Sequence, residues 1–215
     1  EFDDISSKVF ESPFSYSDQV TYYQYSGNDG QRPDIIAKTI LHCHKKFNKR
    51  MMVLFTSRAQ LDNTHQILKQ ISRSEHLPIF AQKRQTSRLG LIRGMGQVSN
   101  GILLGTNAFW EGVDLPGDLL EILIIIKMPF DVPTEPTVKA YGSMVESQGG
   151  NSFMDYALPE SVIRFRQGFG RLIRTQYDDG IFIVMDDRII NKRYGIAFSE
   201  TIPVQMQVFQ RFNDI

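Results

Sequence analysis

Short, continuous apolar runs alternate with helical segments along most of this 215-residue chain. The clearest run lies within residues 51–57. A strand that is apolar at every position has both faces covered, which is typical of a parallel sheet between two helical layers. Further strands are predicted at 19–25, 78–81, 101–106, 119–127 (the longest) and 180–185. This alternation predicts one α/β domain with a parallel sheet flanked by helices on both faces.

Helical periodicity and capping residues fill the segments between these strands. Helices are predicted at 33–47, 58–71, 136–147, 159–175 and 204–212, with a further short helix capped by Thr86 or Ser87. Residues 1–30 are interpreted as a lead-in strand and turn segment, and residues 31–215 as the body of the same domain. The stretch 131–151 is rich in Pro, Gly and Ser and predicts a loop-and-helix excursion rather than a domain boundary.

Composition narrows the class of protein. No apolar run approaches the roughly 20 residues that a membrane helix needs. The single cysteine, Cys43, excludes an internal disulfide and a cysteine-ligated iron–sulfur cluster within this chain, and it favours a reducing, cytoplasmic compartment. The chain begins at Glu1 without methionine, and we expect it to be part of a longer polypeptide.

The net charge is zero, but the charges are unevenly distributed. Between Lys38 and Arg93 there are 12 basic residues and two acidic ones, Asp62 and Glu75, which gives +10. The rest of the chain carries 12 basic and 22 acidic residues, or −10. Such an asymmetry favours contact with a phosphate backbone, although a solvated helix face would give a milder version of it.

The segment 161–174 combines arginine and glycine in an unusual pattern. On a helix, Arg164, Gln167, Arg171 and Arg174 would share one narrow face, and Phe165 would belong to the apolar side. Arginine suits phosphate because its planar fork donates two parallel hydrogen bonds and keeps its charge. Glycines at 168 and 170 lower helix propensity, which suggests that the backbone closely approaches a ligand. The alternative is a surface helix whose arginines are solvated or pair with carboxylates.

A second polar segment, 105–117, follows a predicted strand, at the end where ligands bind in open α/β sheets. Thr106 offers a hydroxyl to a phosphate, Gly112 allows close backbone approach, and Glu111 and Asp114 can hold an arginine or a ribose hydroxyl. The alternative is an ordinary loop in which Trp110 packs under a turn.

The spacing Gln-x-x-Gly-Arg-x-x-Arg at 167–174 resembles motif VI of superfamily 2 helicases. Segment 105–117, with Glu-Gly-Val-Asp at 111–114, resembles motif V of the DinG/XPD group, and 53–57 resembles motif IV. Weaker similarities to DinG-like proteins occur at 12–14 and 185–195. From Ser12 to about Pro203, the chain resembles the second, C-terminal RecA-like lobe of a DinG-type DNA helicase. That lobe belongs to the P-loop NTPase type but has no P-loop of its own.

The resemblance implies a role for each matching residue. Arg171 and Arg174 would be arginine fingers, with Gln167 sensing the γ-phosphate or its water. The nucleotide would also be contacted by Gly105, Glu111, Gly112, Asp114 and Gly170. Single-stranded DNA would be contacted by Thr56, Ser57, Gln82, Thr106 and Trp110, although a core position is an equal alternative for the tryptophan.

The resemblance also implies cofactors and partners. These are ATP, Mg²⁺ held mainly by an N-terminal RecA-like lobe of the same polypeptide, single-stranded DNA and, in part of the family, a fused exonuclease domain. No membrane partner is expected. Because the dipeptide Gly-Lys of a P-loop is absent from the chain, we expect no ATP hydrolysis by this chain alone.

Other interpretations carry less support. A non-catalytic nucleic-acid-binding or docking module with a helicase-like fold remains the main alternative, and a small-molecule enzyme on a doubly wound sheet lacks a glycine-rich loop after a strand. Asp186 and Asp187 follow a Walker B-like strand but have no P-loop partner, so they are interpreted as a strand end in which Arg188 is a candidate ion-pair partner. Residues 42–44, His-Cys-His, would diverge by about 100° per residue on a helix, which disfavours a metal site.

Overall fold

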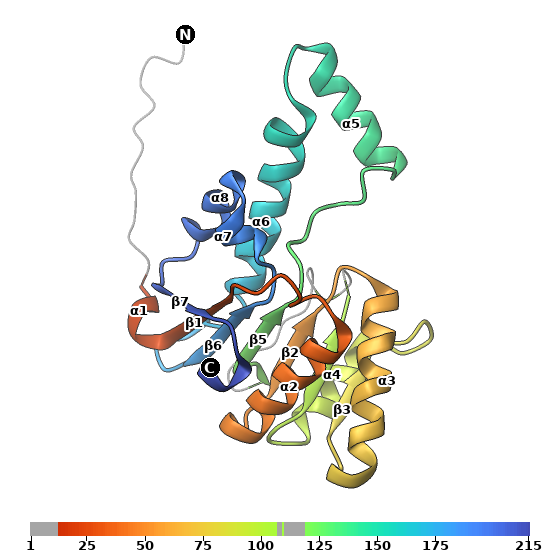
Figure 1. The fold of residues 1–215 in the computed structure, drawn as a ribbon, viewed down its shortest axis with the longest axis vertical. Helices are drawn as coiled ribbons and strands as arrows, with labels where there is room; N and C mark the ends of the chain where they lie inside the picture. The colour runs from red at the N-terminus through yellow and green to blue at the C-terminus, as the bar shows by residue number, and fades with distance from the viewer. Residues whose placement is uncertain (1–12, 107–108, 110–118) are drawn as a thin grey trace.

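All seven strands of the computed structural model form one parallel sheet (Figure 1). The structure describes residues 13–106, 109 and 119–215. The strand order is β3-β4-β2-β5-β6-β1-β7. In chain order the strands are β1 (Val20–Tyr25), β2 (Met51–Leu54), β3 (Ile79–Ala81), β4 (Ile102–Gly105), β5 (Ile122–Ile125), β6 (Gly180–Val184) and β7 (Met206–Phe209).

Helices connect these strands. In the first half of the chain they are α1 (Tyr16–Gln19), α2 (Pro33–Phe47), α3 (Arg58–Glu75) and α4 (Arg88–Gly96). In the second half they are α5 (Pro136–Ser147), a π-helix (Phe153–Ala157), α6 (Leu158–Phe169), α7 (Arg188–Asn191), a 3-10 turn (Arg193–Gly195), α8 (Ile196–Ser199) and a last 3-10 turn (Phe212–Asp214). Helices α2 and α5 match their predicted bounds, and proline occupies the first turn of each, where its missing N–H costs nothing.

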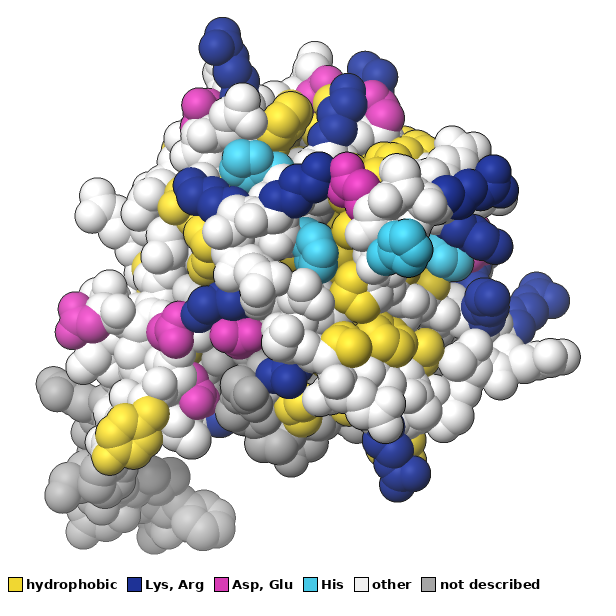
Figure 2. Space-filling view, turned by 90° about the horizontal axis from the view of Figure 1, so that it is seen from below, with side chains coloured by type: hydrophobic (Ala, Val, Ile, Leu, Met, Phe, Trp, Pro, Cys, Tyr) yellow, Lys and Arg dark blue, Asp and Glu magenta, His cyan; other side chains and the backbone are white. Residues whose placement is uncertain are grey.

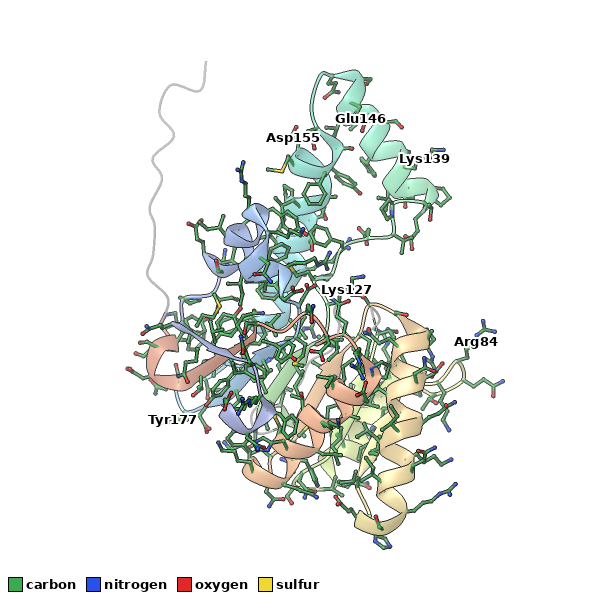
Figure 3. The ribbon with its side chains drawn as sticks, in the orientation of Figure 1. Arg84, Lys127, Lys139, Glu146, Asp155 and Tyr177 are labelled. Carbon is green, nitrogen blue, oxygen red and sulfur yellow. The ribbon has the colours of Figure 1, made fainter. Side chains whose placement is uncertain are left out.

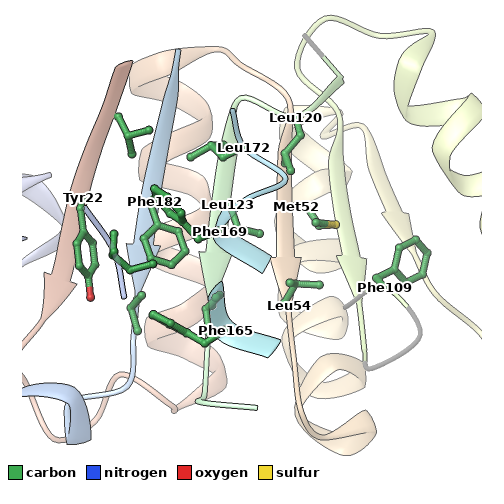
Figure 4. Close-up of a cluster of buried hydrophobic side chains, with 14 of the residues drawn as sticks. Tyr22, Met52, Leu54, Phe109, Leu120, Leu123, Phe165, Phe169, Leu172 and Phe182 are labelled. Atoms are coloured by element: carbon green, nitrogen blue, oxygen red, sulfur yellow. The ribbon is translucent and has the colours of Figure 1, made fainter. Parts of the chain in front are cut away.

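Two hydrophobic layers cover the sheet. On one face, α2 and α3 bury Ile40 and Leu61 against the central strands. On the other face, α4 and α6 pack over residues that include Met52, Leu123 and Phe182 (Figure 4). The rings of Phe165 and Phe169 on α6 lie 5.6 and 5.2 Å from the ring of Phe182. Truncation of such a buried phenylalanine costs about 3–5 kcal/mol, so this aromatic contact fixes α6 on the sheet.

The predicted helix at 159–175 is six residues too long at its C-terminal end. Helix α6 ends at Phe169, and Gly170 is its C-cap. The weak helix propensity of Gly168 and Gly170 accounts for the early end, and the chain then turns toward β6. The predicted strand at 119–127 is also too long, because β5 has only four residues. It is not the longest strand either, since β1 has six residues.

The helix predicted at 204–212 is wrong. Residues Met206–Phe209 form β7, which pairs in parallel with β1 at the edge of the sheet. Apolar and polar residues alternate from Val204 to Val208, which is the period of a strand. Pairing with β1 and burial of Phe209 stabilise this segment as a strand rather than a helix.

A helical arm leaves the body of the domain between β5 and α6 (Figure 1). We define the arm as residues 131–157, which include α5 and the π-helix. The excursion predicted at 131–151 is confirmed as a feature that stands apart from the sheet. It is anchored where Asp131 forms an ion pair with Arg164 of α6.

Candidate functional site

Three of the polar segments singled out in the sequence meet at one edge of the sheet. Thr56 and Ser57 follow β2, Thr106 follows β4, and Gln82 follows β3. These strands are neighbours in the order β3-β4-β2 and run parallel, so their carboxyl ends lie side by side. The structure therefore brings together the four described residues that were predicted to contact DNA.

Gln82 and Thr106 are joined directly. The Oε1 atom of Gln82 accepts hydrogen bonds from the backbone N–H of Thr106 at 2.8 Å and from its Oγ1 at 3.0 Å. A backbone N–H can only donate, so the atom facing it must be the amide oxygen, and this fixes the orientation of the side-chain amide. The Nε2 group consequently points away from Thr106 with two N–H donors. No hydrogen bond from it occurs within the part of the chain that the structure describes.

Ser57 and Thr56 begin the segment that leads into α3. Ser57 is the N-cap residue, and its side chain accepts the backbone N–H of Gln60 at 3.4 Å. Its hydroxyl proton stays available to an acceptor. Thr56 is half-buried and Ser57 is exposed. Both can donate to a phosphate oxygen, a contact that positions a nucleic acid without reading its sequence.

Basic side chains that the residue-by-residue prediction did not name lie at the same edge. Lys83 and Arg84 directly follow Gln82, and Arg88 begins α4. All three are exposed, and Figure 3 shows Arg84 extending outward from the body. The sequence signal was present in the run Lys-Arg-Gln-Thr-Ser-Arg at 83–88, which follows a short predicted strand.

The basic region Lys38–Arg93 does not form one surface. Its cations in the last turn of α2 precede the amino end of β2, at the opposite edge of the sheet. Figure 2, which views the molecule from below, shows Lys and Arg side chains dispersed among Asp, Glu and His rather than gathered in one patch. Several of them pair with carboxylates: Lys45 lies 2.8 Å from Glu75, and Lys49 lies 2.6 Å from Asp179. The charge asymmetry along the sequence is therefore divided between two edges, and only part of it lies beside Gln82 and Thr106.

The predicted arginine fingers lie apart from this edge. Gln167 is exposed on α6, whereas Arg171 and Arg174 follow the end of the helix. Arg171 is half-buried and Arg174 is exposed. The next residues lie near the start of β1, because Gln19 donates from Nε2 to the backbone oxygens of Thr175 and Asp178 at 3.0 and 2.8 Å. The arginine set is thus located toward the amino ends of the strands.

The turn that holds Arg174 is ordered by Asp178. Its Oδ2 accepts the backbone N–H groups of Arg174 and Thr175, each at 2.8 Å, and its Oδ1 accepts the Thr175 hydroxyl at 2.8 Å. Burial alone would raise the pKa of the Asp178 carboxyl, but these hydrogen bonds outweigh burial, and the pKa is lowered. The carboxylate therefore stays charged and fixes the backbone that carries Arg174.

The single helical face expected for these arginines is not observed. Arg164 pairs with Asp131, which matches the alternative that its role is structural. Gly170 is exposed, and a Cβ there would meet the nearest atom, the backbone oxygen of Arg166, at 3.4 Å, an ordinary contact. Gly170 therefore has no packing reason to be glycine within the described residues, beyond ending α6.

Gly105 has such a reason. It is the last residue of β4, and a Cβ built on it would lie 2.7 Å from the Phe109 ring. Close packing of Phe109 therefore explains this glycine without a ligand. The remaining residues predicted in this segment, Trp110, Glu111, Gly112 and Asp114, lie outside the described residues.

Asp186 is fully buried at the carboxyl end of β6. Its Oδ2 accepts the backbone N–H of Met128 at 2.9 Å and Arg188 Nη2 at 2.6 Å, and its Oδ1 accepts Arg188 Nε at 2.9 Å. The interpretation of this aspartate as a strand end paired with Arg188 is confirmed. The guanidinium also lies 5.6 Å from the centre of the Phe130 ring, so the pair fixes the base of the arm.

The described residues contain neither a cluster of metal ligands nor a helix that could cross a membrane. None of their His, Cys, Asp and Glu side chains forms a group of three or more that could hold a metal ion. Cys43 is buried on α2, and burial raises the pKa of its thiol to about 12. In the same part of the chain, no helix has the length and apolar character needed to cross a membrane.

The parallel sheet with helices on both faces has the fold of RecA-like helicase lobes. The family model for the helicase C-terminal domain matches residues 40–205. The chain belongs to this family and is a C-terminal lobe of the DinG/XPD type within superfamily 2.

Two curated relatives and one solved structure illustrate the similarity. The chain is 37% identical over 201 residues to the 3'-5' exonuclease DinG of Bacillus subtilis and 34% identical over 202 residues to the ATP-dependent DNA helicase YoaA of Haemophilus influenzae. These matches cover 90% and 92% of this chain but 22% and 31% of the relatives. A solved structure of XPD in its apo form superimposes with a TM-score of 0.66 at 16% identity, over 89% of this chain and 41% of that one. This last match supports the fold.

Proposed function

We propose that this chain, residues 1–215 as one domain, is the second motor lobe of an ATP-dependent DNA helicase. Residues 1–30 contribute the lead-in and β1, and residues 31–215 form the rest of the lobe. The lobe supplies arginine to an ATP bound by a first lobe and contacts single-stranded DNA. The observation that carries the proposal is the placement of Gln167, Arg171 and Arg174 at the end of α6 in a chain without a P-loop.

The residues present fit an anionic nucleotide better than a metal. The two guanidiniums and the Gln167 amide are donors, and the fork of arginine matches phosphate oxygens. Carboxylate ligands for Mg²⁺ would come mainly from the first lobe. When bound, ATP would supply the phosphoryl group, and Mg²⁺ would supply positive charge that offsets the charge of the phosphates. The Arg171 and Arg174 side chains would stabilise negative charge that develops on the transferred phosphoryl group, and Gln167 would orient its water.

The hydrogen-bond donors at the carboxyl edge can bind a phosphate backbone without reading the bases. The Nε2 group of Gln82, fixed by Thr106, follows β3, and the hydroxyls of Thr56 and Ser57 follow β2, on the other side of β4. Lys83, Arg84 and Arg88 add positive charge beside them. We propose that Trp110 also contacts DNA and that Gly105, Glu111, Gly112, Asp114 and Gly170 contribute to the nucleotide side.

The separation of the two sets supports a division of labour. DNA would lie along the carboxyl edge, and the nucleotide would lie at the end of α6. The segment 107–118 follows β4 and would couple the two. The relatives named as ATP-dependent DNA helicases act on DNA, and the B. subtilis relative is named as an exonuclease. For the whole protein that carries this lobe, we propose DNA-stimulated ATP hydrolysis in a cytoplasmic setting, with a fused exonuclease domain in part of the family.

The test is single-stranded-DNA-stimulated ATP hydrolysis by a polypeptide that carries a first lobe together with this one. Arg171→Ala and Arg174→Ala should each lower stimulated turnover by roughly 10³-fold or more, while nucleotide binding persists. Arg73→Ala is the control, because Arg73 is an exposed arginine in the last turn of α3, which packs on the opposite face of the sheet from α6. Turnover equal to wild type in both variants would contradict the proposal and favour the docking module. ATP hydrolysis by residues 1–215 alone would also contradict it.

A further inference from the structure

The arm exposes an apolar surface that the domain itself does not cover. None of the 12 residues of α5 is buried. Of the eleven large hydrophobic side chains that are exposed within the described residues, six lie in the arm or at the start of α6. They are Val132, Tyr141, Met144, Phe153, Met154 and Ile163, which we call the arm surface. Exposed apolar side chains concentrated in this way mark an interaction surface.

The arm surface also contains a pocket and a distinct charge. A pocket of 340 Å³ lies between α5 and the π-helix and is lined by residues that include Val138, Glu146, Phe153 and Tyr156. Residues 131–163 contain five acidic side chains and one basic side chain, Lys139. Figure 3 shows Glu146, Asp155 and Lys139 at the outer part of the arm. A partner that fits must therefore present apolar side chains beside lysine or arginine.

This charge decides between two classes of partner. The rings of Tyr141 and Tyr156 are stacked with centroids 5.4 Å apart, and exposed aromatic rings can stack on nucleic-acid bases. Nucleic-acid binding, however, depends mainly on cations that neutralise phosphates. The arm keeps an excess of acidic groups even after Asp131 is paired with Arg164. This excess opposes nucleic-acid binding, so the arm surface fits a protein.

One residue of the arm surface lies on α6 between the arm and the proposed nucleotide side of the lobe. This residue, Ile163, is 51% exposed and precedes Gln167 by four residues, so the two side chains lie on the same side of the helix. A first lobe that contacted both Gln167 and the arm would therefore also cover Ile163. The relatives have ample chain to provide that body, since this chain spans 22% and 31% of their lengths.

We infer that the arm surface docks the part of the same polypeptide that carries the first motor lobe, through a basic and apolar surface on that part. This inference rests on the proposed function. It adds that the arm surface holds the two lobes together while Arg171 and Arg174 contact the ATP bound by the first lobe. The arm would act as a lever, because its base is fixed to α6 by the Arg164–Asp131 pair.

The test is hydrogen exchange of the amides of residues 136–157 in the polypeptide that carries both lobes. The double variant Met144→Ala/Met154→Ala removes two exposed side chains of the arm surface but keeps the Tyr141–Tyr156 ring contact and raises the helix propensity of α5, so faster exchange would not come from a weaker arm. We expect exchange at least about tenfold faster in this variant than in wild type. The matched control is Tyr177→Ala/Val208→Ala, which removes similarly exposed side chains from the body and should leave exchange in 136–157 unchanged.

Each alternative has its own signature. Protection that grows with protein concentration would indicate a second copy, and protection that requires single-stranded DNA would indicate a nucleic acid; either result overturns the inference. Equal exchange in wild type and in the Met144→Ala/Met154→Ala variant also overturns it. Because exchange is measured without turnover, loss of activity in Arg171→Ala together with an unprotected arm would retain the proposed function and reject the docking surface.

Discussion

Gln82 and Thr106 tie the ends of two neighbouring strands together, since one amide oxygen accepts both the backbone N–H and the hydroxyl of the threonine. The backbone N–H of Gln82 in turn donates to the carbonyl of Leu104 at 2.9 Å. This arrangement keeps the glutamine side chain in one orientation with its two remaining donors facing outward. It converts two ordinary strand ends into a preorganised donor site.

Gln82→Glu separates the role of the oxygen from that of the Nε2 donors. Glutamate keeps an acceptor for Thr106 but replaces the amide NH₂ with an anionic oxygen that repels phosphate. We expect the affinity for single-stranded DNA to fall by roughly tenfold, equivalent to about 1.4 kcal/mol, with little change in unfolding free energy. Fluorescence anisotropy with a labelled oligonucleotide measures this. Gln85→Glu introduces the same charge on the same exposed loop, and an equal loss of affinity there would show that net charge alone is responsible.

Asp186→Asn should destabilise the domain. The aspartate is fully buried and its carboxylate accepts five hydrogen bonds, four of them from Arg188. Loss of its charge leaves the guanidinium without its counterion, and breaking a buried pair costs about 3–5 kcal/mol. Because Arg188 is partly exposed, we expect the lower end, about 3 kcal/mol, from urea denaturation. Asp187→Asn is the control next to it and should change stability by less than about 1 kcal/mol.

Gly170→Ala tests the nucleotide side without disturbing the fold. The added methyl meets only an ordinary contact with the backbone oxygen of Arg166, so the unfolding free energy should change by less than about 0.5 kcal/mol. If the backbone at Gly170 approaches the nucleotide, as we propose, the KM for ATP should rise. Gly180→Ala should show the reverse pattern, because its Cβ would overlap the Leu172 side chain, and overpacking costs about 1–3 kcal/mol. An unchanged KM in Gly170→Ala would remove this residue from the site.

We expect protonation of three partly buried histidines to destabilise the domain in acid. Burial lowers the pKa of His42, His44 and His65 below the ordinary value of 6.5, and Lys83 and Lys69 lower that of His65 further. A lowered folded-state pKa means that the unfolded chain takes up protons first, so this stability is complete above pH 6.5 and is lost as the pH falls below it. The urea concentration at the midpoint of unfolding should be lower at pH 5.5 than at pH 7.5. His65→Gln should reduce the decrease, and an identical pH dependence in the variant would argue against a contribution from His65.

Local patterns in the sequence were sufficient for the elements that depend on local signals. Proline at the first turn and a regular period were enough for α2 and α5, and the continuous apolar run was enough for β2. The edge strand β7 was missed because its pairing with β1 is a long-range contact. The early end of α6 was missed because helical spacing of the arginines continued past Gly170 in the sequence but not in space.

The candidate site was predicted in its members but not in its arrangement. Thr106 was identified within a motif-like segment and Gln82 only through the family resemblance, whereas their hydrogen bonds depend on the neighbouring positions of β3 and β4 in the sheet. Spacing also grouped Arg164 with Arg171, although its ion pair with Asp131 gives it a different environment. The sequence contains the residue types, but the strand order that brings them together is a tertiary property.

The position of β1 has a consequence for how the chain is made. Strand β1 is made before the other strands of the described residues, and among these it pairs with β6 and β7, which begin at Gly180 and Met206. Its hydrogen-bonding edges must therefore wait for the last fifth of the chain, and contacts so distant in sequence form slowly. Until then β1 presents an unpaired, partly apolar strand, the kind of segment that promotes aggregation. A nascent or truncated chain that ends before β6 should therefore depend on chaperones far more than the complete lobe does.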